Sequence, residues 1–328
     1  MFGQTPLWGE GYEEVVGTLL GWGGANPNTA DEEGITPLAW AARYGHEGIV
    51  KILLERDGVN PDTIDAHGRT PLSHAAENRH EAVVKILLGR SDANPDIADE
   101  EGKTPLLWAI EGGQKGVVRM LLRRIDVNPN KTDKEGRTAL SRAASKGQGG
   151  VMKKLLGRSD VSPDIADNNG QTPLLRAAEN GHEAAVRILL RRRDVNPDAF
   201  DINGETPLLR AALREHWSVV RILLGRNDVN PDIVDANGRS PLSLAAEYGQ
   251  EGIVRILLEE NDIHPDIVDA GGRTPLSLAA QNGHEGVVKI LLGRSDVNPD
   301  IADGGRRTPL WWAEEHRHEG IVRMLLME

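Results

Sequence analysis

Apolar and polar positions along the chain recur with a period of 34 residues. The tripeptide Thr-Pro-Leu marks this period, and Thr138-Ala139-Leu140 and Ser240-Pro241-Leu242 fill its two gaps. Its copies begin at Thr36, Thr70, Thr104, Thr172, Thr206, Thr274 and Thr308. A further copy at Thr5 stands 31 residues before Thr36, so the chain holds ten units, of which the first is degenerate. Such a period is the signature of a stacked repeat architecture.

The unit from Asp269 to Pro299 shows which elements each repeat forms. After the Asp-Ala-Gly-Gly turn signal, Thr274 can cap a helix that begins at Pro275 and ends at Gly283. His284 opens a second helix. Its buried stripe consists of Val287, Val288, Leu291 and Leu292. Helices this short need neighbours to be stable, so we predict an all-α solenoid of about ten helix-turn-helix units with finger-like turns between them.

The repeated phrase resembles the ankyrin repeat. It reads Asp-x-x-Gly-x-Thr-Pro-Leu, then Ala-Ala-x-x-Gly-His, then Val-Val-x-x-Leu-Leu. The Asn-Pro-Asp phrase and the 34-residue period are most similar to the long ankyrin arrays of filamentous fungi. We therefore expect a single ankyrin-repeat domain over residues 1–328. It would comprise a degenerate first repeat (1–35), eight repeats of 34 residues (36–307) and a truncated last repeat (308–328).

Composition and charge narrow the class of partner. The 50 acidic and 38 basic side chains give a formal charge of -12, which opposes binding to a phosphate backbone, so we expect no nucleic acid. The chain has no cysteine, hence no disulfide and no thiolate metal site. Neither a signal peptide nor a long apolar run is seen. We expect a monomer without a membrane anchor, located in the cytoplasm or the nucleus.

No motif indicates a metal, a cofactor or catalysis. His46, His80, His182, His216, His284 and His318 share one repeat position, but three sister repeats carry Gln there, which favours a structural hydrogen bond over a metal ligand. The segment from Asp228 to Asp232 offers oxygens spaced as in a calcium loop, yet Ile233 and Arg239 stand where that loop needs Gly and Glu. Nucleophile elbows and zinc-protease helices are absent. We expect no cofactor and no enzyme activity.

A basic row recurs on the second helices. It consists of Lys51, Lys85, Arg119, Lys153, Arg187, Arg221, Arg255, Lys289 and Arg323. Six of these nine residues have Glu four positions earlier, the orientation that favours an ion pair within a helix. We therefore interpret the row as a solvated, charge-balanced face.

The resemblance implies that a partner protein binds the concave side, built from finger turns and exposed positions of the first helices. There the chain carries aromatic residues on either side of a basic centre. These residues are Trp40, Tyr44, Trp108, Arg142, Lys146, Arg176, Arg210, Arg214 and Tyr248. Trp, Tyr and Arg are typical interface anchors, and arginines at one repeat position suit an acidic, extended segment. The alternative is structural: the tryptophans would be partly core, and the arginines would lay their stems along it.

Two functions from different classes remain open. The first is a protein–protein interaction scaffold or recognition module, as the arm of a larger regulator. The second is a passive structural spacer, or a fragment with no ligand of its own.

Overall fold

A computed structural model describes residues 26–260 and 262–327. Its contacts divide the chain into two compact units, which we describe separately. The first unit reaches residue 143 and includes 148–167, and the second comprises 144–147 and 168–328. Most of the predicted degenerate first repeat lies outside the described residues. The single domain over 1–328 stays a prediction.

The described residues form 18 helices, paired as predicted, and no strand. The first unit contains α2 (Pro37–Tyr44), α3 (Glu47–Leu54), α4 (Pro71–Glu77), α5 (Glu81–Leu88), α6 (Pro105–Glu111), α7 (Lys115–Leu121) and α9 (Gly149–Leu155). Helix α8 (Ala139–Ser145) has residues in both units. The second unit contains α10 (Pro173–Glu179), α11 (Glu183–Leu190), α12 (Pro207–Leu213), α13 (Trp217–Leu224), α14 (Pro241–Glu247), α15 (Glu251–Leu258), α16 (Pro275–Asn282), α17 (Glu285–Leu292), α18 (Pro309–Glu315) and α19 (Glu319–Leu326).

Helix α16 shows why the repeated phrase folds locally as predicted. The Thr274 hydroxyl accepts the backbone N–H of Ser277, which satisfies one of the unpaired donors at the start of the helix. Pro275 is the first helical residue. Gly283 ends the helix with a φ of 77°, in the left-handed region that suits glycine. The predicted boundaries of this helix are confirmed.

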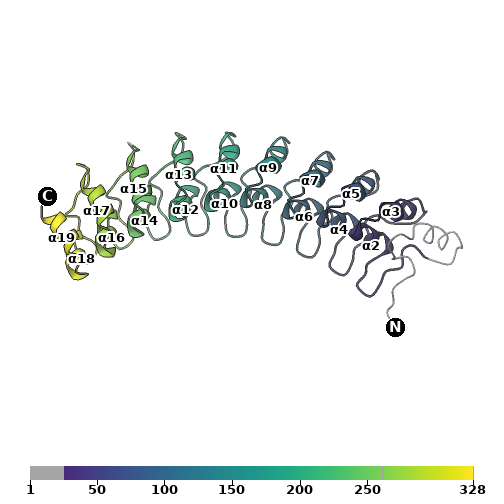
Figure 1. Ribbon diagram of the computed structural model, residues 1–328, viewed down its shortest axis with the longest axis horizontal. Coiled ribbons are helices and arrows are strands. Elements are labelled where there is room, and N and C mark those ends of the chain that lie inside the picture. Colours follow the sequence, from purple (N-terminus) through teal and green to yellow (C-terminus); the bar gives the residue numbers. More distant parts are fainter. Residues whose placement is uncertain (1–25, 261, 328) are drawn as a thin grey trace. The chain divides into compact units, whose positions relative to one another are not determined.

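Within each unit the helices pack in two rows (Figure 1). First helices contact first helices, as α10, α12 and α14 do, and second helices contact second helices, as α11, α13 and α15 do. The core lies between the rows, where Ala211, Ala212 and Val220 are fully buried. The finger turns project beside the first helices and are linked by backbone hydrogen bonds, such as that from Ala236 N–H to the Asn203 carbonyl.

The histidine row joins neighbouring repeats. The Nε2 of His216 lies 3.0 Å from the Glu179 carbonyl, and that of His182 lies 2.9 Å from the Ser145 carbonyl. A carbonyl only accepts, so each Nε2 carries the proton and donates it. Gln148 replaces this bond with its amide, which donates to the Ile110 carbonyl over 2.9 Å. The predicted structural role is therefore confirmed, and the exchange of His for Gln follows because both side chains supply an N–H donor.

In several repeats, an arginine that follows the second helix caps the second helix of the preceding repeat. Arg226 forms a two-bond ion pair with Asp228, and its Nη1 donates to the Leu190 carbonyl at the end of α11, over 3.0 Å. Arg294 does the same with Asp296 and the Leu258 carbonyl. Carbonyls at a helix end lack partners within the helix. The arginine thus supplies a cap for the preceding repeat.

Candidate functional site

Each finger turn is built around one aspartate. In Asp201, Oδ1 accepts the backbone N–H groups of Asn203 and Glu205, which fixes the turn. Oδ2 then faces the first helix of the same repeat, where the residue nine positions on donates to it. Arg210 does so at 2.7 Å, and Trp108 does so to Asp99 at 2.8 Å. Buried carboxylates need such partners.

The two repeats with leucine at that helical position show how strict this requirement is. Leu244 and Leu278 are buried in the core and cannot donate a hydrogen bond. There, Arg239 and Arg273, four residues after the turn aspartate, take over and bond Oδ2 of Asp235 and Asp269 at 2.9 Å each. The donor therefore comes from the helix or from the turn.

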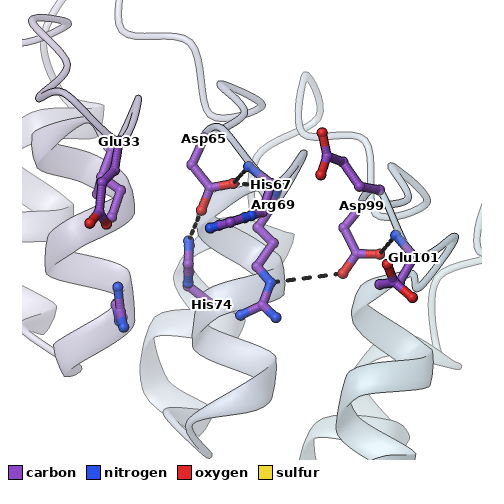
Figure 2. Close-up of a pocket in the computed structure, with 10 residues that line it drawn as sticks. Glu33, Asp65, His67, Arg69, His74, Asp99 and Glu101 are labelled. Atoms are coloured by element: carbon purple, nitrogen blue, oxygen red, sulfur yellow. Dashed lines mark hydrogen bonds and ion pairs between the residues drawn. The ribbon is translucent and has the colours of Figure 1, made fainter.

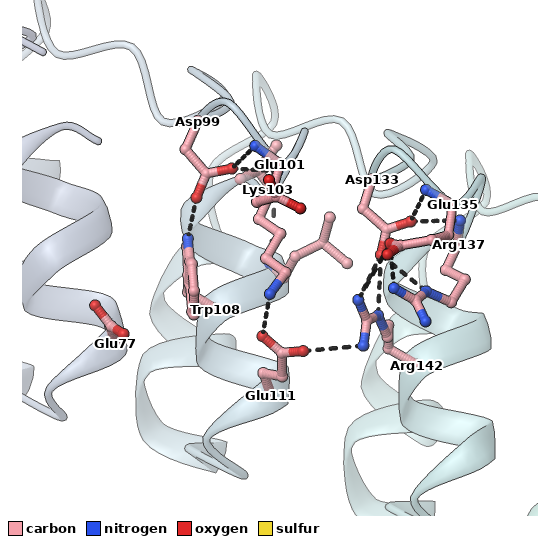
Figure 3. A network of polar contacts seen from close by, with 12 residues as sticks. Glu77, Asp99, Glu101, Lys103, Trp108, Glu111, Asp133, Glu135, Arg137 and Arg142 are labelled. Carbon is pink, nitrogen blue, oxygen red and sulfur yellow. Dashed lines mark hydrogen bonds and ion pairs between the residues drawn. The ribbon is translucent and has the colours of Figure 1, made fainter. Parts of the chain in front are cut away.

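Arg142 is held by carboxylates of its own and the preceding repeat (Figure 3). Its Nη2 lies 2.6 Å from Oδ2 of Asp133, and its Nη1 lies 2.9 Å from Oε1 of Glu111. Glu111 also pairs with Lys103 at 3.0 Å. Burial alone would raise the pKa of Asp133, but the N–H of Arg137 and the guanidinium groups of Arg142 and Arg137 outweigh burial and lower this pKa.

Arg210 has three carboxylate partners in the second unit. It lies 2.6 Å from Glu205, 2.7 Å from Asp201 and 3.2 Å from Glu179. Burial alone would raise the pKa of Asp201, but the Arg210 hydrogen bond helps to lower it below its ordinary value. Arg176 lies 3.9 Å from Glu179.

The structure therefore sorts the predicted binding residues into two groups. One group occupies the helical position that faces the turn aspartate and is half-buried: Trp40, Trp108, Arg142, Arg176 and Arg210. The side chains of Arg142 and Arg210 are only 15% and 13% exposed. The Trp108 ring lies 4.3 Å from both Arg69 and Lys103. Sequence reasoning missed the link to the turn, although the nine-residue spacing from Asp to His, Trp or Arg could have shown it.

The second group occupies a position four residues later and faces solvent. It comprises Tyr44, Lys146, Arg214 and Tyr248. Tyr44 is 50% exposed and Tyr248 is 54% exposed. Arg214 is 55% exposed at its side chain and lies 3.6 Å from Glu179. These residues lie at the C-terminal ends of first helices, and they are the solvent-accessible members of the predicted binding residues.

Apolar side chains are also exposed on the fingers of the second unit. Phe200 and Ile202 flank Asp201, and Val234 and Val268 take the place of Phe200 in the next two repeats. All four are exposed, although the equivalent position is Ala or Thr in several other repeats. The sequence-based choice of residues did not include them. Exposed apolar groups at successive repeats are typical of a binding surface.

A cavity of about 280 Å³ lies beside the fingers of the first unit. Figure 2 shows its lining, where Asp65 bonds Nε2 of His74 at 2.9 Å and Arg69 lies 3.8 Å from Asp99. Burial lowers the pKa of His74 and so favours the neutral ring. The hydrogen bond and the charge of Asp65 oppose this effect. These groups belong to the turn contacts already described.

The basic row on the second helices is exposed at all nine positions. Of the six predicted ion pairs, Glu251–Arg255 and Glu319–Arg323 form within 4 Å. The carboxylate of Glu285 lies over Gly320 of the next repeat instead, because glycine leaves room there. Such exposed pairs contribute only about 0.2–0.5 kcal/mol, so packing decides where the glutamates lie.

A family model described as ankyrin repeats matches the chain in overlapping segments that together span residues 8–328. The chain belongs to the ankyrin repeat family. No match is found among curated proteins. Ankyrin repeats are generally protein–protein interaction modules. Where the ankyrin chain is described, no helix is long and apolar enough to cross a membrane.

The segment of this ankyrin array that imitates a calcium loop uses its oxygens internally. Asp228 pairs with Arg226, and the Asn230 side-chain oxygen accepts the N–H of Asp232 at 3.0 Å. Asp232 in turn accepts the N–H of His264 at 3.1 Å. These are turn and capping contacts. Across 26–260 and 262–327, no group of three or more potential ligands gathers.

Proposed function

We propose that this ankyrin chain is a protein–protein interaction module that binds a partner protein on the face formed by its first helices and finger turns. This is the concave face that the resemblance implies. The main support for this proposal is a contrast between two exposed positions of the repeat. The helix-end position that holds Tyr44 and Tyr248 carries six residue types in nine repeats, whereas the row on the second helices is Lys or Arg throughout. A varied face can distinguish partners, and a uniform charged face mainly keeps the chain soluble.

The second unit offers the strongest anchor. Arg214 and Tyr248 end α12 and α14, which contact each other, and both side chains are exposed. Phe200 and Ile202 lie on the finger that precedes α12, and Val234 on the finger that precedes α14. Arginine and aromatic side chains beside apolar contacts are the usual composition of a binding hot spot. We assign the centre of the interface to these five residues.

An acidic, extended segment stays the predicted partner of the basic positions. At Arg210 and Arg214 such a segment would compete with Glu179, which lies 3.2 and 3.6 Å from them. Glu179→Gln should strengthen binding of an acidic segment, whereas Arg214→Glu should weaken it. A partner that binds through apolar contacts alone would not respond to Glu179→Gln.

Site-specific photo-crosslinking in the native cell tests the face. A photoreactive phenylalanine replaces Tyr248 or Arg214, and matched controls carry it at Arg255 and Arg221 on the second helices of the same repeats. Those controls are 62% and 58% exposed at their side chains, similar to the test sites. We expect one protein to be captured from the test sites only. Capture from the second helices alone would refute the face, and no capture from any site would favour the passive spacer.

A further inference from the structure

In several repeats, the aspartate of the Asn-Pro-Asp phrase joins its repeat to the next. Oδ2 of Asp96 accepts the backbone N–H of Asn128 at 2.7 Å. Asp198 and Asp266 accept the N–H groups of Asn230 and Asn298 in the same way, at 2.9 Å each. The acceptor and the donor are always 32 residues apart. One carboxyl oxygen per joint is thus accounted for.

The other oxygen of these aspartates is buried and unsatisfied. Oδ1 of Asp96, Asp198 and Asp266 is shielded from solvent and has no hydrogen-bond partner. A buried polar atom without a partner is unfavourable, and a charged one is more so. A regular feature that is unfavourable in three joints calls for a different protonation state or a missing donor.

Two other repeats show which contact this oxygen lacks. Asn130 accepts the N–H of Ser162 with its oxygen at 3.0 Å and donates its Nδ2 to the Asp160 carbonyl at 2.6 Å. Asn28 likewise donates Nδ2 to the Gly58 carbonyl at 2.8 Å. Both carbonyls stand 30 residues after the asparagine. The same register gives the three aspartates the backbone carbonyls of residues 126, 228 and 296.

A carbonyl accepts hydrogen bonds and cannot donate them. A carboxylate oxygen in that place therefore meets a second acceptor, whereas a neutral carboxyl group would reproduce both contacts of asparagine. We propose that Asp96, Asp198 and Asp266 take up protons in the folded chain and donate them to the carbonyl of the next repeat, so that mild acidification tightens the joints between repeats. No other ligand is needed, because the proton comes from solvent.

Around the three carboxyl groups, burial outweighs the backbone hydrogen bonds and the positive charges that oppose it. Burial raises the pKa of each. The carboxylate of Asp228 raises the pKa of Asp198 further, and Arg226 opposes it. Asp296 acts likewise on Asp266. Around Asp96, Lys131 and Arg158 lower its pKa, and Asp126 raises it.

The pKa of each of the three carboxyl groups is raised in the folded chain, so their protonation stabilises the folded state. This stabilisation is complete at a pH below the ordinary pKa of 3.8 and is lost as the pH rises through the raised pKa. His74 acts in the opposite sense because burial lowers its pKa, so every variant is compared with the unmodified chain at each pH.

Thermal unfolding between about pH 7.5 and pH 4.5 tests the proposal with two complementary variants. The triple variant Asp96→Asn, Asp198→Asn and Asp266→Asn should have a melting temperature about 2–4 °C above that of the unmodified chain at the upper pH. Its melting temperature should rise less on acidification than that of the unmodified chain. Asn130→Asp should melt lower at the upper pH, and the gap should close at the lower pH. A triple variant that melts lower, or an Asn130→Asp gap that is the same at every pH, would overturn the proposal.

A measurement on the unmodified chain covers the case in which a variant fails to fold. The side-chain carboxyl carbons of ¹³C-labelled aspartate report each titration by NMR, and the triple variant or single variants assign the three signals. We expect these three midpoints above the ordinary value of 3.8. Midpoints at or below that value would show that the carboxyl groups stay ionised and would reject the proposal.

Discussion

The end of each first helix is a sensitive point, because the next repeat covers it. At Gly181, with a φ of 69°, an added Cβ would lie 2.8 Å from the His216 ring. Gly113 has a similar φ of 68°, but its added Cβ would meet only the amide of Gln148, at 3.8 Å. The chain itself follows this rule. The non-glycine residues Arg79 and Glu215 occupy this position with positive φ only where the next repeat carries Gln in place of His.

The comparison of Gly181→Ala with Gly113→Ala isolates the effect of the histidine ring. Both substitutions place alanine in the left-handed region, which costs about 1–2 kcal/mol. Gly181→Ala also forces the ring to shift, and overpacking of this kind costs about 1–3 kcal/mol more. We therefore expect Gly113→Ala to lose about 1–2 kcal/mol of stability and Gly181→Ala about 2–5 kcal/mol.

Urea unfolding of both variants, with native-state hydrogen exchange to locate the loss, measures these differences. Adding His216→Gln to Gly181→Ala should recover most of the excess, because glutamine keeps the donor for the Glu179 carbonyl and removes the ring. Equal losses at Gly113 and Gly181 would refute the reasoning, as would an unchanged loss after His216→Gln.

Arg210→Leu should lower the free energy of unfolding by about 3 kcal/mol, measured by thermal unfolding, because it leaves Asp201 buried without its main donor. Adding Glu205→Arg should recover part of this loss, because it recreates the arrangement of Arg239 and Leu244 in a later repeat. His182→Ala should cost about 1 kcal/mol in urea unfolding, whereas His182→Gln should be nearly neutral; equal losses would contradict the donor role. Micromolar Ca²⁺ or Zn²⁺ should leave the melting temperature unchanged, since a ligand that binds only the folded chain raises it, and a rise of several degrees would reinstate a metal site.

The helices and the histidine row could be predicted because their signals are local and recur. Thr274, Pro275 and Gly283 define the ends of one helix by their own backbone preferences. His182 and Gln148 could be recognised as equivalent because they occupy the same repeat position and share a donor group. In both cases the 34-residue period supplied nine comparisons within one chain.

The candidate site was harder to predict because its contacts are not local. Whether Arg210 faces solvent or Asp201 depends on how the finger turn folds over the first helix, and no helical periodicity encodes that. Tyr248, which the resemblance placed at an exposed position, is exposed, whereas the half-buried position of Arg142 carries equally polar residues and looks the same in the sequence. Phe200 and Ile202 were overlooked because turns are expected to be polar.

The most direct test of the proposed interface is an affinity measurement with the protein captured by crosslinking. One variant combines Arg214→Ala and Tyr248→Ala, and its matched control combines Arg221→Ala and Arg255→Ala on the second helices. If the face of first helices and finger turns binds the partner, the first variant should lose affinity about tenfold or more, the equivalent of about 1.4 kcal/mol, and the control should lose less than about twofold. Equal losses from the two variants, or a loss from the control alone, would contradict the account.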